Sequence, residues 1–199
     1  PDAPAPKPAL VDVKIFAGPL LNNLLLPAFV IDSLGYVQAW NQAVETLWQL
    51  SRHPTPPLHI LERLFDPSTH SLLGEGWQSA IAGFIEDFYR MTLALSGSSE
   101  YGLMIRTLEQ RYGEEFVGVW NEAGARVAGA DQDCALDMDG LRVLYQDSQT
   151  EIHFLVVQSI FRLSMPYRLL IHVPFGADSY RRYKTLFAGM EPQRVYFSE

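Results

Sequence analysis

The sequence has little cysteine, little positive charge and no long hydrophobic run. Its 199 residues include one cysteine, Cys134, which excludes an intramolecular disulfide and is typical of a reducing compartment. Lys and Arg number 15 against 23 Asp and Glu, a net charge of −8, so this segment is not expected to bind nucleic acid. No stretch approaches the roughly 20 apolar residues that span a bilayer. We therefore expect a cytoplasmic protein without membrane contact.

Motifs for catalysis and for metal or phosphate binding are also missing. The run Gly74-Glu75-Gly76 lacks the third glycine of a dinucleotide fingerprint and follows no predicted strand. No serine lies in a nucleophile elbow, and the five histidines never occur at metal-ligand spacing. We expect no enzymatic activity, no metal and no cofactor. Haem can be bound by a single histidine ligand, which His59 or His70 could supply, so a haem sensor remains an alternative.

What the sequence does contain is material for a packed core, with 48% hydrophobic and 12% aromatic residues. Residues 11–26 have helical spacing broken at Gly18-Pro19, which predicts one or two short helices. Two β-prone runs, 27–32 and 36–40, flank a turn where Gly35 supplies positive φ, and this pattern predicts a hairpin. Asn41 follows at the N-cap position of a further helix.

The rest of the chain predicts helices first and strands afterwards. Between Leu58 and Trp120 the period is helical; one long helix carries Trp77 and extends to Leu95, and Ser99 is expected to cap the next. A long loop is expected from Ala123 to Gly140. Three antiparallel strands then follow at about 141–146, 151–165 and 168–173, with a closing helix at about 179–188. This order predicts an α+β fold: a five-stranded antiparallel sheet with a large helical insertion between strands 2 and 3.

The start of the chain predicts an interdomain boundary. The segment Pro1-Asp2-Ala3-Pro4-Ala5-Pro6-Lys7-Pro8 is proline-rich and has no initiator methionine. We therefore interpret residues 1–10 as a linker, 11–190 as one domain and 191–199 as a C-terminal tail, with a further domain expected upstream.

Two sets of residues carry a family resemblance. The hairpin run from Pro27 to Asp32 and the step Trp40-Asn41-Gln42-Ala43 resemble the opening of a PAS domain. Further along, Leu64-Phe65-Asp66-Pro67, then Trp77, then Glu114-Glu115-Phe116 followed by Trp120 resemble the C-terminal domain of MmyB-like transcription regulators. The likeness covers about Leu26 to Leu186. It departs from the family pattern after Trp120, where Asn121-Glu122-Ala123-Gly124 stands.

The resemblance implies a PAS-like ligand-binding domain that follows an Xre-type helix-turn-helix. The protein would contact DNA only through that upstream helix-turn-helix, and it would act as a homodimer. It also implies an elongated apolar pocket for a fatty-acid-like molecule. The sequence offers eleven candidate wall residues: Phe29, Ile31, Trp40, Phe84, Phe88, Met91, Phe116, Trp120, Phe154, Val156 and Phe161. Three further residues are candidate partners of a carboxylate head group, namely Arg90, Arg106 and His153.

Three hypotheses follow from the sequence. The aromatic surplus fits a ligand cavity, which would make the domain a sensor, but it equally fits a plain hydrophobic core. In the second case the domain would be an interaction module that dimerises through the helix at 11–26 or through strand edges. A haem- or flavin-dependent sensor, or a small hydrolase, is the third and least supported hypothesis.

Overall fold

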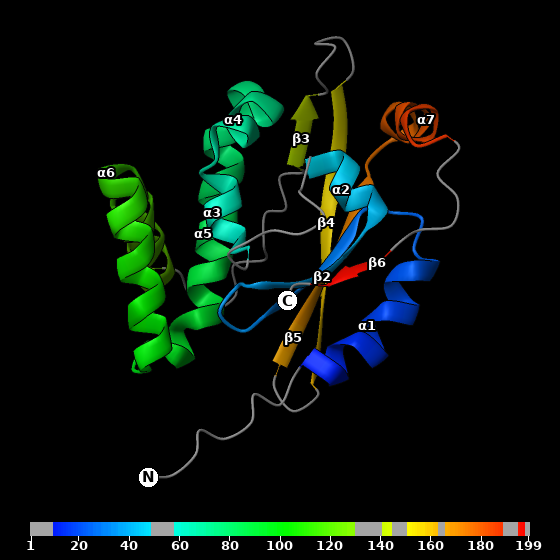
Figure 1. Ribbon diagram of the computed structural model, residues 1–199. Helices are drawn as coiled ribbons and strands as arrows, with labels where there is room; N and C mark the ends of the chain where they lie inside the picture. The colour runs from blue at the N-terminus through cyan, green and yellow to red at the C-terminus, as the bar shows by residue number, and fades with distance from the viewer. Residues whose placement is uncertain are drawn as a thin grey trace. The chain divides into compact units, whose positions relative to one another are not determined.

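The computed structural model describes residues 10–48, 58–129, 141–144, 151–162, 166–188 and 195–197. It confirms the α+β class and the helical insertion, because five α-helices within the described ranges separate the second strand from the third (Figure 1). The described elements are α1 (Leu10–Asn23), β1 (Ala28–Asp32), β2 (Val37–Asn41), α2 (Gln42–Trp48), α3 (Ile60–Leu64), α4 (Pro67–Leu73), α5 (Trp77–Thr92), α6 (Ser99–Gly129), β3 (Leu141–Leu144), β4 (Glu151–Arg162), β5 (Pro166–Pro174), α7 (Ala177–Leu186) and β6 (Val195–Phe197).

The chain divides into two compact units. Unit 1 comprises residues 1–58, 157–172 and 187–199, and unit 2 comprises residues 59–156 and 173–186. Strands β4 and β5 contribute residues to both units, so the division follows packing and not the ends of elements.

Unit 1 contains the hairpin that the sequence predicts. Its strands are hydrogen-bonded in the order β4-β5-β1-β2-β6. Strand β1 pairs antiparallel with β2, with Phe29 opposite Trp40, and antiparallel with β5, with Phe29 opposite Leu170. Strand β6 pairs with β2 and places Tyr196 opposite Trp40. Thus the segment predicted as a tail adds a short sixth strand to the five expected.

The turn between β1 and β2 is organised by one carboxylate. Oδ1 of Asp32 accepts the backbone N–H of Leu34 at 2.9 Å and of Tyr36 at 3.0 Å, and Oδ2 accepts the Gln38 side chain at 3.0 Å. Gly35 has a φ of 89°, which confirms the positive φ predicted for it. Burial raises the pKa of Asp32, and the hydrogen bonds that it accepts oppose this effect.

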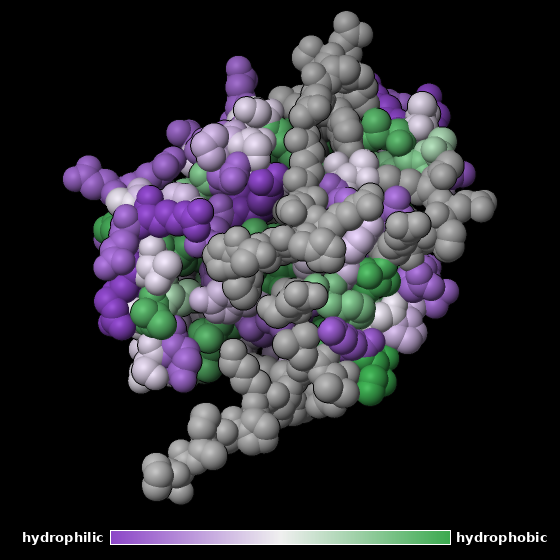
Figure 2. Space-filling model, viewed as in Figure 1, coloured by the Kyte–Doolittle hydropathy of each residue, from purple (hydrophilic) through white to green (hydrophobic). Residues whose placement is uncertain are grey.

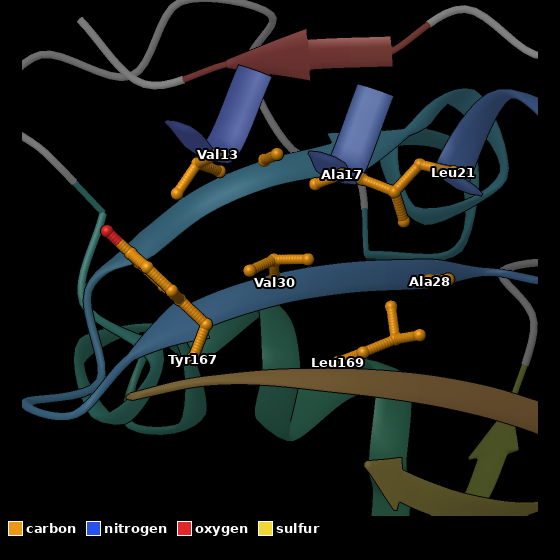
Figure 3. Packing of buried hydrophobic residues seen from close by; sticks show 8 residues of the cluster. Val13, Ala17, Leu21, Ala28, Val30, Tyr167 and Leu169 are labelled. Carbon is orange, nitrogen blue, oxygen red and sulfur yellow. The ribbon is translucent and has the colours of Figure 1, made fainter. Parts of the chain in front are cut away.

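Helix α1 covers one face of the unit 1 sheet. It is a single helix with Pro19 inside it, so the sequence break at Gly18-Pro19 does not divide it. Its buried side chains point toward the strands, as Figure 3 shows for Val13, Ala17 and Leu21. The strand side of this cluster is formed by small and aliphatic residues with one aromatic ring: Ala28, Val30, Ala39, Tyr167 and Leu169. This face is therefore filled by the chain itself.

Unit 2 contains the helical insertion. Helices α5 and α6 pack along each other, and their outer surface carries mainly hydrophilic side chains (Figures 1 and 2). An ionic contact joins them, because Glu86 of α5 pairs with Arg126 of α6 at 2.9 Å. Glu86 also pairs with Arg90 on its own helix at 2.7 Å. Gly113 has φ 56° and ψ −137°, a non-helical conformation that kinks α6.

Two local predictions in this region are wrong. The loop expected from Ala123 is helical as far as Gly129, and residues 130–140 lie outside the described part of the chain. The small residues there indicated a loop, but they let two helices approach: a Cβ on Gly124 would lie 3.1 Å from the Tyr89 ring. Ser99 is the first residue of α6 and not its cap, since the Ser98 hydroxyl accepts the N–H of Tyr101 at 3.1 Å.

Other predicted boundaries differ by a few residues. Helix α5 ends at Thr92 and continues as a 3₁₀ turn over Leu93–Leu95, and the closing helix is α7, slightly earlier than expected. Strand β3 pairs antiparallel with the first half of β4 in unit 2. Among the described residues, no helix is both long and apolar enough to cross a membrane.

Candidate ligand-binding site

The second face of the unit 1 sheet is lined by the larger side chains. Successive strand residues point to opposite faces, and residues directly opposite on antiparallel strands point to the same face. Since Val30, Ala39 and Leu169 point to α1, their neighbours point away from it. Phe29, Trp40 and Leu170 therefore form one row across three strands. We call this surface the Trp40 face; it consists of Phe29, Ile31, Trp40, Leu170 and His172.

Aromatic rings extend this face toward β6 and α2. The ring of His172 lies 5.7 Å from that of Phe29 and 5.6 Å from that of Trp48, centroid to centroid. Trp40 stacks on Tyr196 of β6 at 5.9 Å. The five side chains of the Trp40 face are all buried. The face thus consists of buried aromatic and aliphatic side chains from three neighbouring strands.

The Trp40 face carries no net charge. Four of its members are apolar or aromatic, and burial lowers the pKa of the fifth, His172, from its usual 6.5 to about 4; a hydrogen bond involving Pro27 opposes this only partly. The imidazole is therefore neutral at physiological pH. A cation appears at the end of the face, where half-buried Arg168 lies opposite Ile31 and donates to Gln158 at 3.4 Å.

The indole nitrogen of Trp40 is buried, and it has no hydrogen-bond acceptor among the residues that the structure describes. A buried donor of this kind costs about 1–3 kcal/mol if nothing satisfies it. In contrast, the indole N–H of Trp77 in unit 2 donates to the carbonyl of Leu64 at 2.9 Å. The arrangement at Trp40 can therefore bind an acceptor that the described chain does not itself supply.

The sequence predicted only part of this face. Phe29, Ile31 and Trp40 were candidates, and the structure brings them together. Leu170 and His172 were missed, although both lie in the predicted strand at 168–173. Side-chain alternation along β5 could have identified them. Once the pairing of β5 with β1 is known, the even-numbered residues of β5 point to the same face as Phe29 and Trp40. That pairing joins segments far apart in the chain, so single-sequence periodicity did not give it.

Three other predicted residues form an aromatic cluster inside unit 2. The rings of Phe88 and Trp120 lie 6.3 Å apart, and those of Phe116 and Trp120 lie 5.4 Å apart. Phe65 joins the cluster through Phe116 at 5.8 Å, and Tyr89 joins it through Trp120 at 5.0 Å. These contacts hold α3, α5 and α6 together. The predicted residues Phe84 and Met91 of α5 are half-buried.

The remaining apolar candidates lie in different surroundings. Phe161 contacts Phe16 at 4.6 Å and Tyr167 at 5.7 Å, which places it on the α1 side of the sheet and not on the Trp40 face. In unit 2, Phe154 is buried against Tyr183 of α7, and Val156 is half-buried. The candidates therefore fall into separate groups in the two units, and the single cavity lined by all of them stays a prediction.

The three predicted head-group partners all belong to unit 2. Arg90 is paired with Glu86 on its own helix, and Arg106 is exposed on α6. His153 lies 3.0 Å from the carboxylate of Glu151, and both side chains are partly exposed. Their role as head-group partners also stays a prediction. Arg168 is a further cation, opposite Ile31 at the end of the Trp40 face, and was not predicted from the sequence.

The two histidines considered for haem have structural contacts. His59 caps α3, because its Nδ1 accepts the backbone N–H of Leu61 at 3.1 Å, and its ring packs edge-on against Phe88 at 5.8 Å. The ring of His70 packs against Trp77 at 3.7 Å. Within the described ranges, no three His, Cys, Asp or Glu side chains are grouped so that they could hold a metal ion.

Comparison with known proteins bears on the same part of the chain. A search of curated proteins finds no relative. Among protein families, the model of the MmyB-like transcription regulator ligand binding domain matches residues 19–150, which is more than half of the chain and includes the hairpin and the helical insertion. On this match, the chain belongs to the family of MmyB-like transcription regulator ligand-binding domains.

Proposed function

We propose that this chain is the sensory domain of a helix-turn-helix transcription regulator and that it binds a small apolar, fatty-acid-like molecule on the Trp40 face. The observation that carries the proposal is the buried indole N–H of Trp40, which has no acceptor among the described residues. A core that is filled only by its own side chains rarely leaves such a donor unpaired. A ligand oxygen would satisfy it.

The surroundings of Trp40 favour an apolar ligand. Phe29, Ile31 and Leu170 are buried hydrocarbon side chains, and His172 is neutral at physiological pH. Burial of an acyl chain against such surface contributes about 0.8 kcal/mol for each CH₂ group. One polar contact among apolar walls is the usual composition of a small-molecule site.

The sensing step would be a shift between two conformations of the domain. A ligand shifts such an equilibrium only by its difference in affinity for the two states, so no chemical conversion of the ligand is needed. We propose a non-enzymatic role in the cytoplasm. DNA contact would come from an upstream helix-turn-helix, in a homodimer that places two such elements on a palindromic site.

Small-molecule extraction and thermal unfolding test the proposal together. Denatured, purified protein should release an acyl-containing molecule that mass spectrometry detects. Protein stripped of ligand should unfold at a higher temperature with acyl compounds of 8 to 18 carbons, such as fatty-acid methyl esters. Its free energy of unfolding should rise by about 2.7 kcal/mol at a hundredfold excess over Kd. Trp40→Phe should weaken this stabilisation, whereas Trp77→Phe, which changes an indole already paired to Leu64, should not.

If the protein releases no small molecule and no acyl compound raises its unfolding temperature, the sensor proposal is wrong.

One observation favours the alternative of an interaction module. Helix α1 exposes Ile15, Phe16 and Leu20, with 70%, 44% and 36% of their surface accessible. The occupant proposed for this surface is a second copy of the chain, because a two-fold axis would pair the same apolar side chains. Sedimentation equilibrium of the wild type and of Ile15→Lys distinguishes the cases. A dimer that the substitution dissociates supports the module, and a monomeric wild type excludes it.

A further inference from the structure

We infer that the polar end of the ligand is an uncharged hydrogen-bond acceptor, such as an ester, amide or alcohol oxygen, and that it receives the indole N–H of Trp40. This inference rests on the proposed function and narrows it: the ligand is fatty-acid-like in its chain but does not present a carboxylate anion to Trp40.

The indole N–H of Trp40 needs a hydrogen-bond acceptor. Indole has one N–H and no acceptor, so only a group with an available lone pair can satisfy it. Trp40 is fully buried, its ring is held between its strand neighbours and Tyr196, and its nitrogen has no acceptor in the described ranges. The missing partner is therefore a hydrogen-bond acceptor.

The charge of the surrounding side chains favours a neutral acceptor. The side chains that share the face are Phe29, Ile31, Leu170 and His172, none of which is a cation at neutral pH. An anion moved from water into such surroundings costs several kcal/mol unless a cation pairs with it. One indole N–H offsets only a small part of that cost. A neutral acceptor avoids it.

Arg168 is the cation that could instead bind a carboxylate head group. Arg168 points to the same side of β5 as Leu170 and His172, but it lies opposite Ile31, one row away from the row of Trp40. Two strand spacings, roughly 10 Å, separate its backbone from that of β2. Its guanidinium donates to exposed Gln158. A carboxylate bound at Arg168 would leave the donor of Trp40 unsatisfied.

The test compares three ligands of equal chain length: decanoic acid, methyl decanoate and decanol. Their Kd values at pH 7.5 are measured by calorimetry with the wild-type protein, Trp40→Phe and Arg168→Gln. We expect the ester and the alcohol to bind the wild type about tenfold more tightly than the acid. Trp40→Phe should remove most of this preference, and Arg168→Gln should leave all three affinities unchanged.

A second measurement follows the indole protons directly. The chain has four tryptophans, so ¹⁵N-labelled protein gives at most four indole resonances, and the spectra of Trp40→Phe and Trp77→Phe identify the two that matter. Addition of methyl decanoate should move the Trp40 indole proton downfield, as expected for a new hydrogen bond. The Trp77 resonance, already hydrogen-bonded to Leu64, should stay in place.

The outcomes separate the inference from the proposed function. Tighter binding of decanoic acid than of its ester, lost in Arg168→Gln, would overturn the inference but keep the sensor. A Trp40 resonance that does not move, together with unchanged ester affinity in Trp40→Phe, would also overturn it. If no ligand binds the wild type, the proposed function itself fails.

Discussion

The side chain of Asn41 accepts the backbone N–H of Ala28 at 3.1 Å and so joins the end of β2 to the start of β1. The same oxygen accepts the N–H of Val44 at 3.2 Å, which caps α2. The amide group donates to the carbonyls of Leu24 at 3.2 Å and Leu26 at 2.8 Å, just beyond the end of α1. One carboxamide therefore fixes α1, the hairpin and α2 next to Trp40.

The four hydrogen bonds of the Asn41 side chain predict that Asn41→Asp destabilises the fold nearly as much as Asn41→Ala. An aspartate keeps the two accepting bonds but cannot donate to the two carbonyls, so it places an anion beside them. We expect each variant to lose about 3 kcal/mol or more of unfolding free energy, measured in urea. Gln42→Ala, at a half-buried neighbour, serves as the control. A loss below 1 kcal/mol for the aspartate variant would show that the donated bonds contribute little.

The sequence predicted one of these four bonds. The step Trp40-Asn41-Gln42-Ala43 identified Asn41 as a helix cap, and the structure confirms it. The other three bonds depend on how α1 and β1 approach Asn41 after folding, which a local motif does not specify. In the same way, the hairpin and its glycine were predicted because their signals are local.

Local sequence patterns also predicted only part of the candidate site. Phe29, Ile31 and Trp40 were found because they lie in one local hairpin. Phe161 was chosen for its hydrophobic character, but a strand has two faces, and the contact with Phe16 places this residue on the other one. Leu170 and His172 are recognised only through their register with β1.

The two indoles give a second prediction, on protein without ligand. In Trp77→Phe the carbonyl of Leu64 loses its partner, so both the hydrogen bond and the indole packing are lost. Trp40→Phe also loses indole packing, but no hydrogen bond to a described residue is lost, and an unsatisfied donor is removed. We expect Trp77→Phe to be the more destabilising by about 1 kcal/mol or more in chemical unfolding. The reverse order would mean that Trp40 is already hydrogen-bonded in the empty protein.

His172 gives a third prediction, on pH. Its pKa in the folded protein, about 4, lies below the 6.5 of an exposed histidine. As pH falls below 6.5 the unfolded chain binds a proton that the folded protein does not, so stability is lost between about pH 6.5 and 4. The loss from this group is on the order of 3 kcal/mol. Thermal unfolding of wild type and His172→Gln across this window should show a smaller pH slope in the variant. Parallel slopes would contradict the neutral, buried state.

The kink in α6 gives a fourth prediction. Gly113 has φ 56° and ψ −137°, which L-residues rarely adopt, yet a Cβ there would meet no atom within 4 Å. Gly113→Ala should therefore cost about 1–3 kcal/mol through backbone strain alone. Gly118 lies in the same helix without positive φ and also has open space, so Gly118→Ala should stabilise by about 0.5–1 kcal/mol. If both substitutions stabilise, the kink is not a fixed feature of α6.

The most direct test of the central claim, that an apolar molecule binds on the Trp40 face, is photolabelling with a decanoyl ester that carries a diazirine on its chain, followed by peptide mass spectrometry. We predict that label appears in the peptides containing Phe29 to Trp40 and Arg168 to His172, and that excess methyl decanoate removes it. Label confined to the exposed side chains of α1, Ile15 and Phe16, and unaffected by the competitor, would contradict the claim.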